Sequence, residues 1–220
     1  MANMQYSPAI FEQPDLAAAA GIILTPEAGL TTDQRWARET PYLADLIIND
    51  LGLDHIDGDD HVPAIIDYGC GIGRLASPLL DAGASVIGVE ISQSMREQAR
   101  QYLGGSAGEF SILDPRFFSE CAREGRIEAN GAIAIWSLQH VLDVKQAIND
   151  IYSVLKPGSL FVVVNSNTRA VPTDAGWIND GVSVINELNA KFTPLFGRKL
   201  NPAKMGDAVA GSSFYGVFKR

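Results

Sequence analysis

Residues 62–74 read VPAIIDYGCGIGR, an apolar run that passes directly into three closely spaced glycines. A short apolar run is typical of a parallel strand that is buried on both faces. Gly69, Gly71 and Gly73 let the backbone turn sharply and let a ligand approach it, because no Cβ atom stands in the way. The stretch therefore predicts a buried strand that ends in a ligand-binding loop.

Strands and helices alternate through the segment that follows this loop. We expect strands at residues 85–90, 110–113, 132–136 and 160–165, and helices at 74–82, 92–103, 116–124 and 144–155. Alternation of this kind predicts an α/β fold, a parallel sheet with helices on both faces. Since the crossovers of such sheets are right-handed, ligands bind at the carboxyl ends of the strands. Past residue 170 the pattern weakens, with a helix expected within 174–191 and a closing strand at 212–219.

Polar side chains mark where three of the helices should begin. Thr31 is followed by Gln34, and Ser94 by Glu97, in the spacing of a capping box. Asp143 precedes an apolar helical stripe and is expected to cap that helix through its carboxylate. The first of these patterns predicts a helix ahead of the glycine loop.

The segment before the glycine loop differs in composition from the rest of the chain. Residues 1–30 contain three prolines and two glycines and are expected to form an irregular arm. Pro41 should interrupt the helix that follows the arm, or start a second one. Residues 52–61 read GLDHIDGDDH, an acidic linker. We therefore divide the chain into an N-terminal arm with a helical cap (1–61) and a ligand-binding domain (62–220).

The formal net charge of −9 is unevenly distributed along the 220 residues. Residues 1–61 carry 11 acidic and 2 basic side chains, whereas residues 191–220 carry 1 acidic and 6 basic ones. The sequence contains no long basic stripe, which disfavours duplex nucleic acid as a partner. An acidic cap would admit a neutral or cationic ligand more readily than a polyanion.

The cysteines, the first residues and the apolar runs indicate where in the cell the protein is expected to act. Cys70 and Cys121 are too few for a disulfide framework, and no CxxC pair suggests a metal site. The first residues lack the basic segment and the apolar segment of a secretory signal. The apolar runs are too short to span a bilayer. These features predict a cytoplasmic protein that binds neither a structural metal nor a membrane.

Glu90 stands at the end of the second expected strand, next to the glycine loop in such a fold. A carboxylate there can accept two hydrogen bonds from the vicinal hydroxyls of a ribose. Loop and acid together predict a nucleoside-containing cofactor. The nicotinamide fingerprint would require glycine where Arg74 stands, and the carboxylate of Asp67 would repel a pyrophosphate. An NAD-dependent oxidoreductase is thus an alternative that the glycine spacing disfavours.

Three segments resemble the motifs of the class I S-adenosylmethionine-dependent methyltransferases. The first is IIDYGCGIGRLASPLLDAGASVIGVEISQSMREQAR, and the others are WSLQHVLD and IYSVLKPGSLFVVVN. They follow one another in the order of that family, within residues 62–165. The resemblance implies a Rossmann-like, seven-stranded and mostly parallel sheet, whose antiparallel last strand would be SSFYGVFK at 212–219.

The resemblance also implies roles for individual residues. The loop around the methionine moiety of S-adenosyl-L-methionine would consist of Asp67, Gly69, Cys70, Gly71 and Gly73. The ribose would bind Glu90, the adenine would lie against Ile91 and Asp114, and the methyl group would lie beside Trp136. Arg35, in the helix before the first strand, is the candidate partner of the cofactor's carboxylate.

A methyl group on a sulfonium is already activated, so the reaction needs little chemical help from the protein. A general base is required only if the acceptor arrives protonated, and His140 is the candidate because it follows the fourth strand. The alternative is that His140 serves local packing. Residues 136–139 read WSLQ and lack the Asn/Asp-Pro-Pro-aromatic motif, which disfavours methylation of amino groups on adenine or glutamine.

The sequence leaves the acceptor and its nucleophilic atom (O, N, C or S) open. A small-molecule acceptor is the favoured expectation, with the chain acting as a monomer or a homodimer. One alternative is a non-catalytic module that retains S-adenosylmethionine as a ligand. Another is a methyltransferase that acts on RNA or protein and uses the basic residues within 191–220 to bind an anionic partner.

Overall fold

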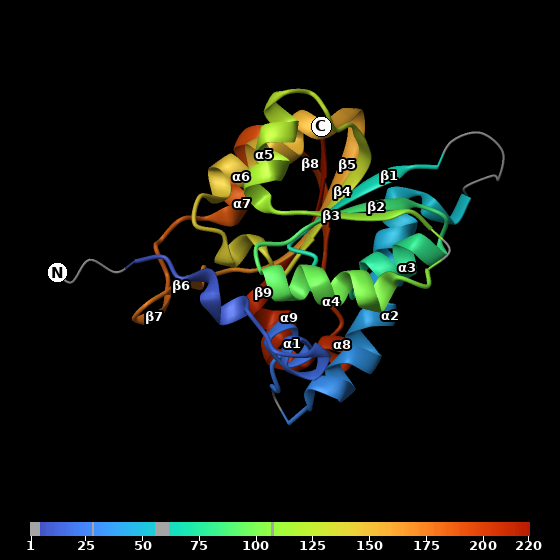
Figure 1. Ribbon diagram of the computed structural model, residues 1–220. Helices are drawn as coiled ribbons and strands as arrows, with labels where there is room; N and C mark the ends of the chain where they lie inside the picture. The colour runs from blue at the N-terminus through green and yellow to red at the C-terminus, as the bar shows by residue number, and fades with distance from the viewer. Residues whose placement is uncertain (1–4, 28, 56–61, 107) are drawn as a thin grey trace.

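The computed structural model describes residues 5–27, 29–55, 62–106 and 108–220 and is built around a seven-stranded sheet (Figure 1). The strands are β1 (Ala64–Tyr68), β2 (Ser85–Val89), β3 (Phe110–Leu113), β4 (Ala129–Ile135), β5 (Leu155–Ser166), β8 (Thr193–Arg198) and β9 (Ser213–Lys219). They lie in the order β3-β2-β1-β4-β5-β9-β8. The first five strands in this order run parallel, and β9 runs antiparallel to both of its neighbours. The predicted α/β fold and its antiparallel closing strand are confirmed.

Helices cover both faces of the sheet. One face packs against α2 (Thr32–Leu51), α3 (Ala76–Asp81), α8 (Pro202–Met205) and α9 (Asp207–Ser212), with the end of α4 (Gln93–Leu103) at its edge. The other face packs against α5 (Pro115–Arg123), α6 (Val144–Val154) and α7 (Val184–Lys191). Because neighbouring residues of a strand point to opposite faces, Ile65 belongs to the first layer and Ile66 to the second.

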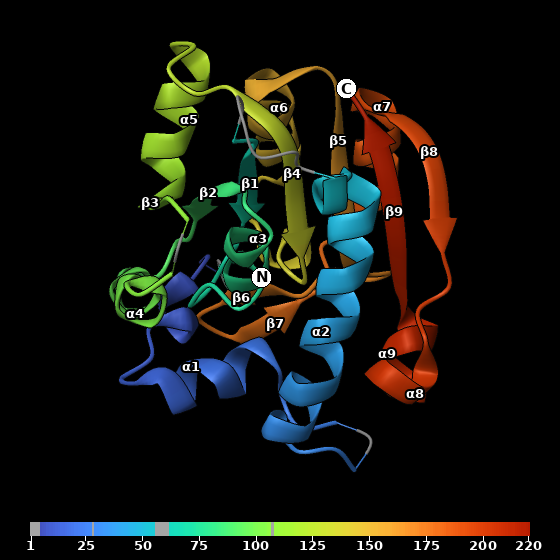
Figure 2. The same cartoon turned by 90° about the vertical axis from the view of Figure 1, so that its right-hand side faces the viewer.

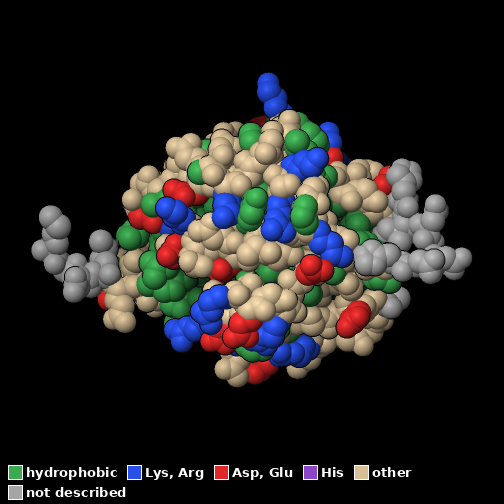
Figure 3. Space-filling view, turned by 90° about the horizontal axis from the view of Figure 1, so that it is seen from above, with side chains coloured by type: hydrophobic (Ala, Val, Ile, Leu, Met, Phe, Trp, Pro, Cys, Tyr) green, Lys and Arg blue, Asp and Glu red, His purple; other side chains and the backbone are tan. Residues whose placement is uncertain are grey.

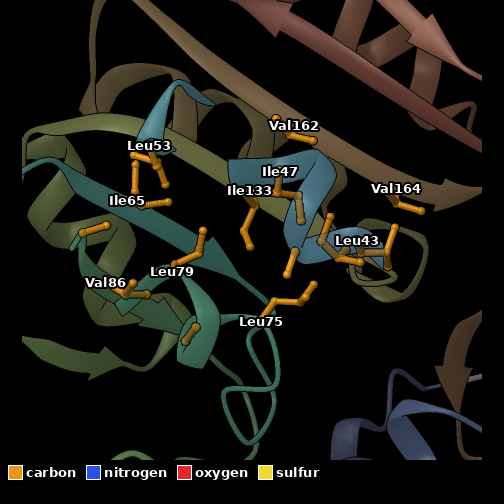
Figure 4. Packing of buried hydrophobic residues seen from close by; sticks show 14 of the residues in the cluster. Leu43, Ile47, Leu53, Ile65, Leu75, Leu79, Val86, Ile133, Val162 and Val164 are labelled. Atoms are coloured by element: carbon orange, nitrogen blue, oxygen red, sulfur yellow. The ribbon is translucent and has the colours of Figure 1, made fainter. Parts of the chain in front are cut away.

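Helix α2 is part of this core. Leu43 and Ile47 on its inner face are fully buried and meet Ile65, Val162 and other apolar side chains of the sheet (Figure 4). The residues from the predicted cap therefore share a core with the predicted ligand-binding domain. The expected boundary after residue 61 lies next to residues 56–61, which fall outside the described part of the chain, as does most of the acidic linker.

The predicted capping box at the start of α2 is confirmed, but the predicted break at Pro41 is wrong. The hydroxyl of Thr31 accepts from the backbone N–H of Gln34, whose side chain accepts from the N–H of Thr31. The helix then continues through Pro41 to its C-cap, Gly52, which has a φ of 69°. Pro41 lies on the exposed face of α2, where water can bond to the carbonyl that proline leaves without a helical partner.

The N-terminal arm is more regular than its composition predicts. Residues Pro8–Phe11 form the 3₁₀ helix η1, and Leu16–Ile23 form the α-helix α1. Asp15 caps α1 by accepting from the N–H of Ala18 at 2.9 Å. The expectation of an irregular arm is therefore wrong, because an alanine-rich segment with an aspartate cap favours a helix once its apolar side can pack.

Two other local expectations differ from the structure. The N-cap of α4 is Ser92, whose hydroxyl accepts from the N–H of Met95, and not Ser94. Strand β8 was not expected, because Pro194 and full exposure along the strand hide the alternation of a half-buried strand. By contrast, Asp143 caps α6 as predicted and accepts from the N–H of Gln146.

A small hairpin extends from the carboxyl end of β5. It consists of β6 (Val171–Thr173) and β7 (Gly176–Ile178), which pair antiparallel outside the main sheet. In Figure 2, this hairpin and α1 lie at the end of the molecule towards which β4 points. The carboxyl edge of the sheet, where ligands bind in this class of fold, is therefore covered by segments from both ends of the chain.

The surface charges are mixed. On the face shown in Figure 3, Lys and Arg side chains lie among Asp and Glu side chains. Lys191 and Arg220 both lie over the ring of Tyr152. Within the described residues, no helix is long and apolar enough to cross a membrane.

Candidate functional site

A cavity of about 590 Å³ lies at the carboxyl ends of the parallel strands. Its floor is formed by the ends of β1, β2 and β4, and its walls by η1, α1, the start of α2, the β6–β7 hairpin and the end of α9. Ligand pockets usually have volumes of about 300–1,000 Å³. The cavity is large enough for a ligand of nucleoside size together with a second small molecule.

The glycine loop lines this cavity through Gly69 and Gly71. Both have a positive φ, 78° and 57°, which favours glycine. A Cβ atom on Gly69 would lie 2.2 Å from the Cβ of Ser137, and one on Gly71 would lie 2.8 Å from the Cδ1 of Ile23. Gly69 therefore lets the ends of β1 and β4 approach closely, and Gly71 lets α1 pack over the loop.

Three of the predicted loop residues do not line the cavity: Gly73, Cys70 and Asp67. The loop turns at Gly73, which has a φ of 86° and leaves no room for a Cβ beside the Cδ1 of Leu103. The thiol of Cys70 is buried in an apolar cluster with Ala99 and Ile112, and this burial raises its pKa well above the usual range. Their positions fit a role in shaping the loop.

Glu90 lies in the cavity wall, at the end of β2. Its two carboxylate oxygens accept from the backbone N–H groups of Gly71 and Ser92, each at 2.9 Å. Burial raises the pKa of Glu90, and these N–H bonds act against that rise. Each carboxylate oxygen can accept more than one hydrogen bond, so the group can still accept from the hydroxyls of a ligand.

Asp67 lies behind the loop. It is 3% exposed, and its Oδ2 has no hydrogen-bond partner. Burial raises its pKa to about 7, although Arg74 acts to lower that value and Glu90 adds to the rise. A buried carboxylate without a full set of partners is costly, which marks Asp67 as a group that a positive charge in the cavity would stabilise.

The predicted adenine residues occupy different positions. Ile91 lines the cavity, and so does Pro115. Asp114 instead caps α5, where it accepts from the N–H of Arg116, and its Oδ2 lies 3.5 Å from the Nη1 of Arg96. The structure therefore brings the backbone near Asp114 to the cavity, but not its carboxylate.

Trp136 ends β4 in a conformation that is rare for a residue with a side chain. Its φ is 59°, and its indole Nε1 is buried without a hydrogen-bond partner. Such backbone outliers cluster at ligand sites. Trp136 lines the cavity, but its Nε1 is shielded from solvent and is not exposed there.

Arg35 reaches the cavity from α2 with a guanidinium that is 5% exposed. Its Nε donates to Glu39 at 2.5 Å, and its Nη1 donates to the carbonyl of Thr25 at 2.8 Å. The carboxylate of Glu27 lies 3.9 Å from Nη1. Arg35, the predicted partner of the cofactor's carboxylate, is thus held at the wall of the cavity.

Comparisons with known proteins agree with this geometry. A family model described as a methyltransferase domain matches residues 66–163. A ubiquinone biosynthesis O-methyltransferase of Stutzerimonas stutzeri (strain A1501) is 26% identical over 179 residues, which cover 78% of this chain and 73% of that protein. Magnesium protoporphyrin IX methyltransferase from Synechocystis PCC 6803, whose crystal structure contains bound SAM, has the same fold: the TM-score is 0.63 over 96% of this chain and 93% of that one, at 15% identity.

Residues 66–163 thus belong to the methyltransferase-domain family, and the chain has the fold of the class I S-adenosylmethionine-dependent methyltransferases. The similarity also includes an S-adenosyl-L-methionine-dependent Diels-Alderase of Talaromyces variabilis, 32% identical over 111 residues. That match covers 48% of this chain, and the chain spans 37% of the length of that protein. The family therefore contains proteins named for methyl transfer and at least one named for another reaction.

The cavity of this methyltransferase fits the cofactor of its family at several points. Glu90 can bind the ribose, Gly69 and Gly71 leave room for the ligand, and Arg35 can meet a carboxylate. The assignments of single residues to parts of the cofactor stay predictions, and Asp67, Cys70, Gly73 and Asp114 could contribute only indirectly in the observed arrangement.

His140 faces the same cavity, and its hydrogen bonds determine its tautomer. The N–H of Ser166 donates to the Oε1 of Gln139 at 2.7 Å, so the amide nitrogen of Gln139 is its donor end. That nitrogen lies 3.1 Å from the Nε2 of His140, which therefore accepts. The Nδ1 then carries the proton and donates to the carbonyl of Ala170 at 2.6 Å.

The imidazole of His140 is kept neutral. Burial lowers its pKa, and the cation of Arg169 acts in the same direction. A neutral ring with its lone pair on Nε2 is the form that can take up a proton. The one lone pair of the ring is already bound to the amide of Gln139, so His140 can act as a base only after that bond breaks. The role of His140 as a base stays a prediction.

Aromatic rings around His140 were not identified from the sequence. The rings of Phe11 and Trp177 lie 5.8 and 5.0 Å from the imidazole, and 5.9 Å from each other. Phe11 comes from η1 and Trp177 from the β6–β7 hairpin, and both line the cavity together with Tyr6. No local sequence pattern predicts this cluster, because Phe11 and Trp177 come from segments that are far apart in the sequence.

The arm is fastened to the domain at two places. Tyr6 pairs with Thr173 in a single antiparallel bridge to the hairpin. The carboxylate of Glu12 accepts from the N–H groups of Gln93 and Ser94, at 2.8 and 2.9 Å, where α4 begins. Burial works against that carboxylate, but its hydrogen bonds together lower the pKa of Glu12. The arm is thereby held across the cavity.

Proposed function

We propose that this methyltransferase binds S-adenosyl-L-methionine at the glycine loop and transfers its methyl group to a small molecule held beside His140. The observation that carries the proposal is a single cavity that joins Glu90 and Gly69 on one side to His140 and Trp177 on the other. The first pair fits a nucleoside cofactor, and the second pair fits an acceptor. Residues of the arm, among them Phe11 and Ile23, form part of the cavity wall and shield that side from water.

The bound cofactor supplies an activated methyl group on sulfur. The protein has to hold the acceptor in line with that group, roughly 3 Å from it, and to exclude water. Phe11 and Trp177 offer flat apolar faces for positioning an acceptor. If the acceptor atom carries a proton, the Nε2 of His140 can receive it once the amide of Gln139 has moved off that nitrogen.

We propose a hydroxyl on a neutral, planar molecule as the acceptor. Relatives named ubiquinone biosynthesis O-methyltransferase support oxygen as the acceptor atom. The three rings of Phe11, His140 and Trp177 support a planar molecule, because aromatic side chains bind other rings by stacking or edge contacts. A neutral imidazole fits a neutral hydroxyl better than a pre-ionised acceptor, which would need no base.

The direct test is calorimetric titration with S-adenosylmethionine, S-adenosylhomocysteine and NAD, followed by an assay for S-adenosylhomocysteine with a panel of catechols and other phenols. We expect binding of the first two and product formation with at least one phenol. Binding of NAD alone would overturn the proposal. Tight cofactor binding without S-adenosylhomocysteine from any acceptor would favour a cofactor-dependent cyclase, a function suggested by the name of the Talaromyces variabilis relative, or a non-catalytic module.

Replacing His140 with alanine is expected to lower kcat on the order of 10²-fold while leaving the affinity for S-adenosylmethionine unchanged, because general bases contribute at least that much. His140→Asn is the matched variant: its amide can still donate to Ala170 but has no lone pair at the place of Nε2. Equal losses in both variants would support the base. Retention of kcat in His140→Asn would instead assign the ring to packing.

Other properties belong to the same proposal. We propose that residues 1–61 act as a cap and residues 62–220 as the methyltransferase domain, in a monomer or a homodimer in the cytoplasm. The cap function is supported by the contacts of Tyr6 and Glu12, which hold the arm over the cavity.

A further inference from the structure

Glu39 is a buried carboxylate that the proposed reaction does not use. Its exposed fraction is 0%, and it lies one turn after Arg35 on the inner face of α2. Its Oε1 accepts from the Nε of Arg35, whereas its Oε2 has no hydrogen-bond partner. Buried glutamates are rare and costly, so this one calls for an explanation.

A contribution to stability does not explain why Glu39 is buried. A buried ion pair is often no better for stability than apolar side chains of similar size, because desolvation offsets the attraction. Burial raises the pKa of Glu39 in spite of Arg35 and Arg74, so desolvation outweighs both of these cations. What the pair does provide is a fixed direction for the guanidinium of Arg35.

The guanidinium of Arg35 is held at two of its nitrogens. Nε donates to Glu39, and Nη1 donates to the carbonyl of Thr25. Since the group is planar and rigid, two fixed donors define its plane. A guanidinium has five N–H donors, so donors remain for a ligand in the cavity that Arg35 lines.

Glu39 also competes with a second carboxylate for Arg35. The side chain of Glu27 is 43% exposed, and its Oε2 lies 3.9 Å from the Nη1 of Arg35. Glu27 also lines the cavity, and without the charge on Glu39 it would be the remaining carboxylate beside the guanidinium. Glu39 therefore determines the direction in which the guanidinium of Arg35 points.

The other side of Glu39 faces the glycine loop. The Nη1 of Arg74 donates to the hydroxyl of Thr40 at 3.2 Å, and its guanidinium lies 5.9 Å from the ring of Trp36. Glu39 attracts this second buried cation as well, and Arg74 is in turn attracted by Asp67. The bond from Arg74 to Thr40 thus joins the end of the glycine loop to α2, next in sequence to Glu39.

We infer that Glu39 is a positioning residue: it holds Arg35 at the cavity wall so that the guanidinium meets the carboxylate of the cofactor's methionine moiety. This inference rests on the proposed function, because it assumes that S-adenosylmethionine occupies the cavity. It distinguishes Glu39 from Arg35, which would touch the ligand, and from Glu27, which lines the cavity with a side chain that is 43% exposed.

The test compares two ligands that differ in the group in question. S-adenosylhomocysteine carries the carboxylate, whereas 5′-methylthioadenosine has the same nucleoside without the amino-acid part. In Glu39→Gln we expect the affinity for S-adenosylhomocysteine to fall about tenfold or more, as for loss of a charge-assisted hydrogen bond, and the affinity for 5′-methylthioadenosine to stay unchanged. Calorimetry on the full chain measures both.

Two further variants make the result decisive. Glu124→Gln removes the carboxylate of a surface ion pair with Arg126 and should change neither affinity. The double variant Arg35→Met/Glu39→Leu should stay folded and bind both ligands with similar affinity, even if Glu39→Gln alone does not fold. Equal losses for both ligands in Glu39→Gln, or preserved discrimination in the double variant, would overturn the inference. Failure of the wild-type chain to bind either ligand would overturn the proposed function itself.

Discussion

Replacing Gly69 with alanine is expected to lower the free energy of unfolding by about 2–5 kcal/mol and to weaken binding of S-adenosylhomocysteine. The new Cβ would lie 2.2 Å from the Cβ of Ser137, far inside the contact distance of about 3.5–4 Å for two carbons. Neither Gly69 nor Ser137 can shift easily, because each is held by a hydrogen bond. The N–H of Gly69 donates to the carbonyl of Val89 at 2.7 Å, and the hydroxyl of Ser137 donates to the carbonyl of Tyr68 at 2.6 Å.

The expected loss in the free energy of unfolding has two parts. The positive φ costs about 1–2 kcal/mol once a Cβ is present, and overpacking adds about 1–3 kcal/mol or more. Their sum approaches the stability of about 5–15 kcal/mol that is typical of a native protein. Urea denaturation followed by circular dichroism measures it.

Gly125→Ala is the matched control for this variant. Its φ is 66°, but a Cβ there would meet no atom within 4 Å, so it carries the conformational cost without the overlap. Adding Ser137→Gly to Gly69→Ala removes the colliding Cβ and should restore part of the stability. If Gly69→Ala proved as stable as Gly125→Ala, the close approach of β1 and β4 would not be what requires glycine.

The sequence predicted the sheet well because the signals of its strands are local. Apolar runs such as Phe110–Leu113 have the length and the flanking turns of buried parallel strands, and this strand has the predicted bounds. The glycine loop and Glu90 were also found, since each depends on residue type at a strand end. Strand β8 was not predicted, because this exposed edge strand contains Pro194 and shows neither an alternation of apolar and polar residues nor an apolar run.

The floor of the cavity could be predicted from the sequence, but its walls could not. Its floor comes from consecutive strand ends, whereas its walls come from contacts between distant segments. Glu12 reaches Gln93 across 81 positions, and Phe11 meets Trp177 from the other end of the chain. Glu39 was missed because glutamate on a helix is normally solvated, and only the fold shows that this one faces the core.

Replacing Asp67 with asparagine is expected to raise the stability of the protein and to weaken its affinity for S-adenosylmethionine. Burial raises the pKa of Asp67 to about 7, whereas an unfolded chain would give a value near 3.9. The folded protein therefore disfavours the ionised form, and the cost grows as the pH rises from about 4 to about 7. Above pH 7 it reaches its full value, on the order of 4 kcal/mol.

Asparagine removes this cost, so the difference in the free energy of unfolding between variant and wild type should grow with pH and level off near pH 8. The attraction of Arg74 for the carboxylate acts in the opposite direction, but the raised pKa shows that burial outweighs it. Urea denaturation between pH 5 and 8 measures the difference. A variant less stable than the wild type at pH 8 would contradict the argument.

The same charge should favour the cofactor. S-adenosylmethionine carries a sulfonium and an ammonium against one carboxylate, so it stabilises an ionised Asp67 behind the loop. The wild type should then bind it about tenfold more tightly at pH 8 than at pH 6, as for a group with a pKa near 7. The affinity of Asp67→Asn should change little with pH. S-adenosylhomocysteine lacks the sulfonium charge and serves as the control ligand, with a weaker pH dependence expected in the wild type. Asp67 would thus lower the stability of the empty fold while favouring a cationic ligand, a trade-off of the kind found at functional sites.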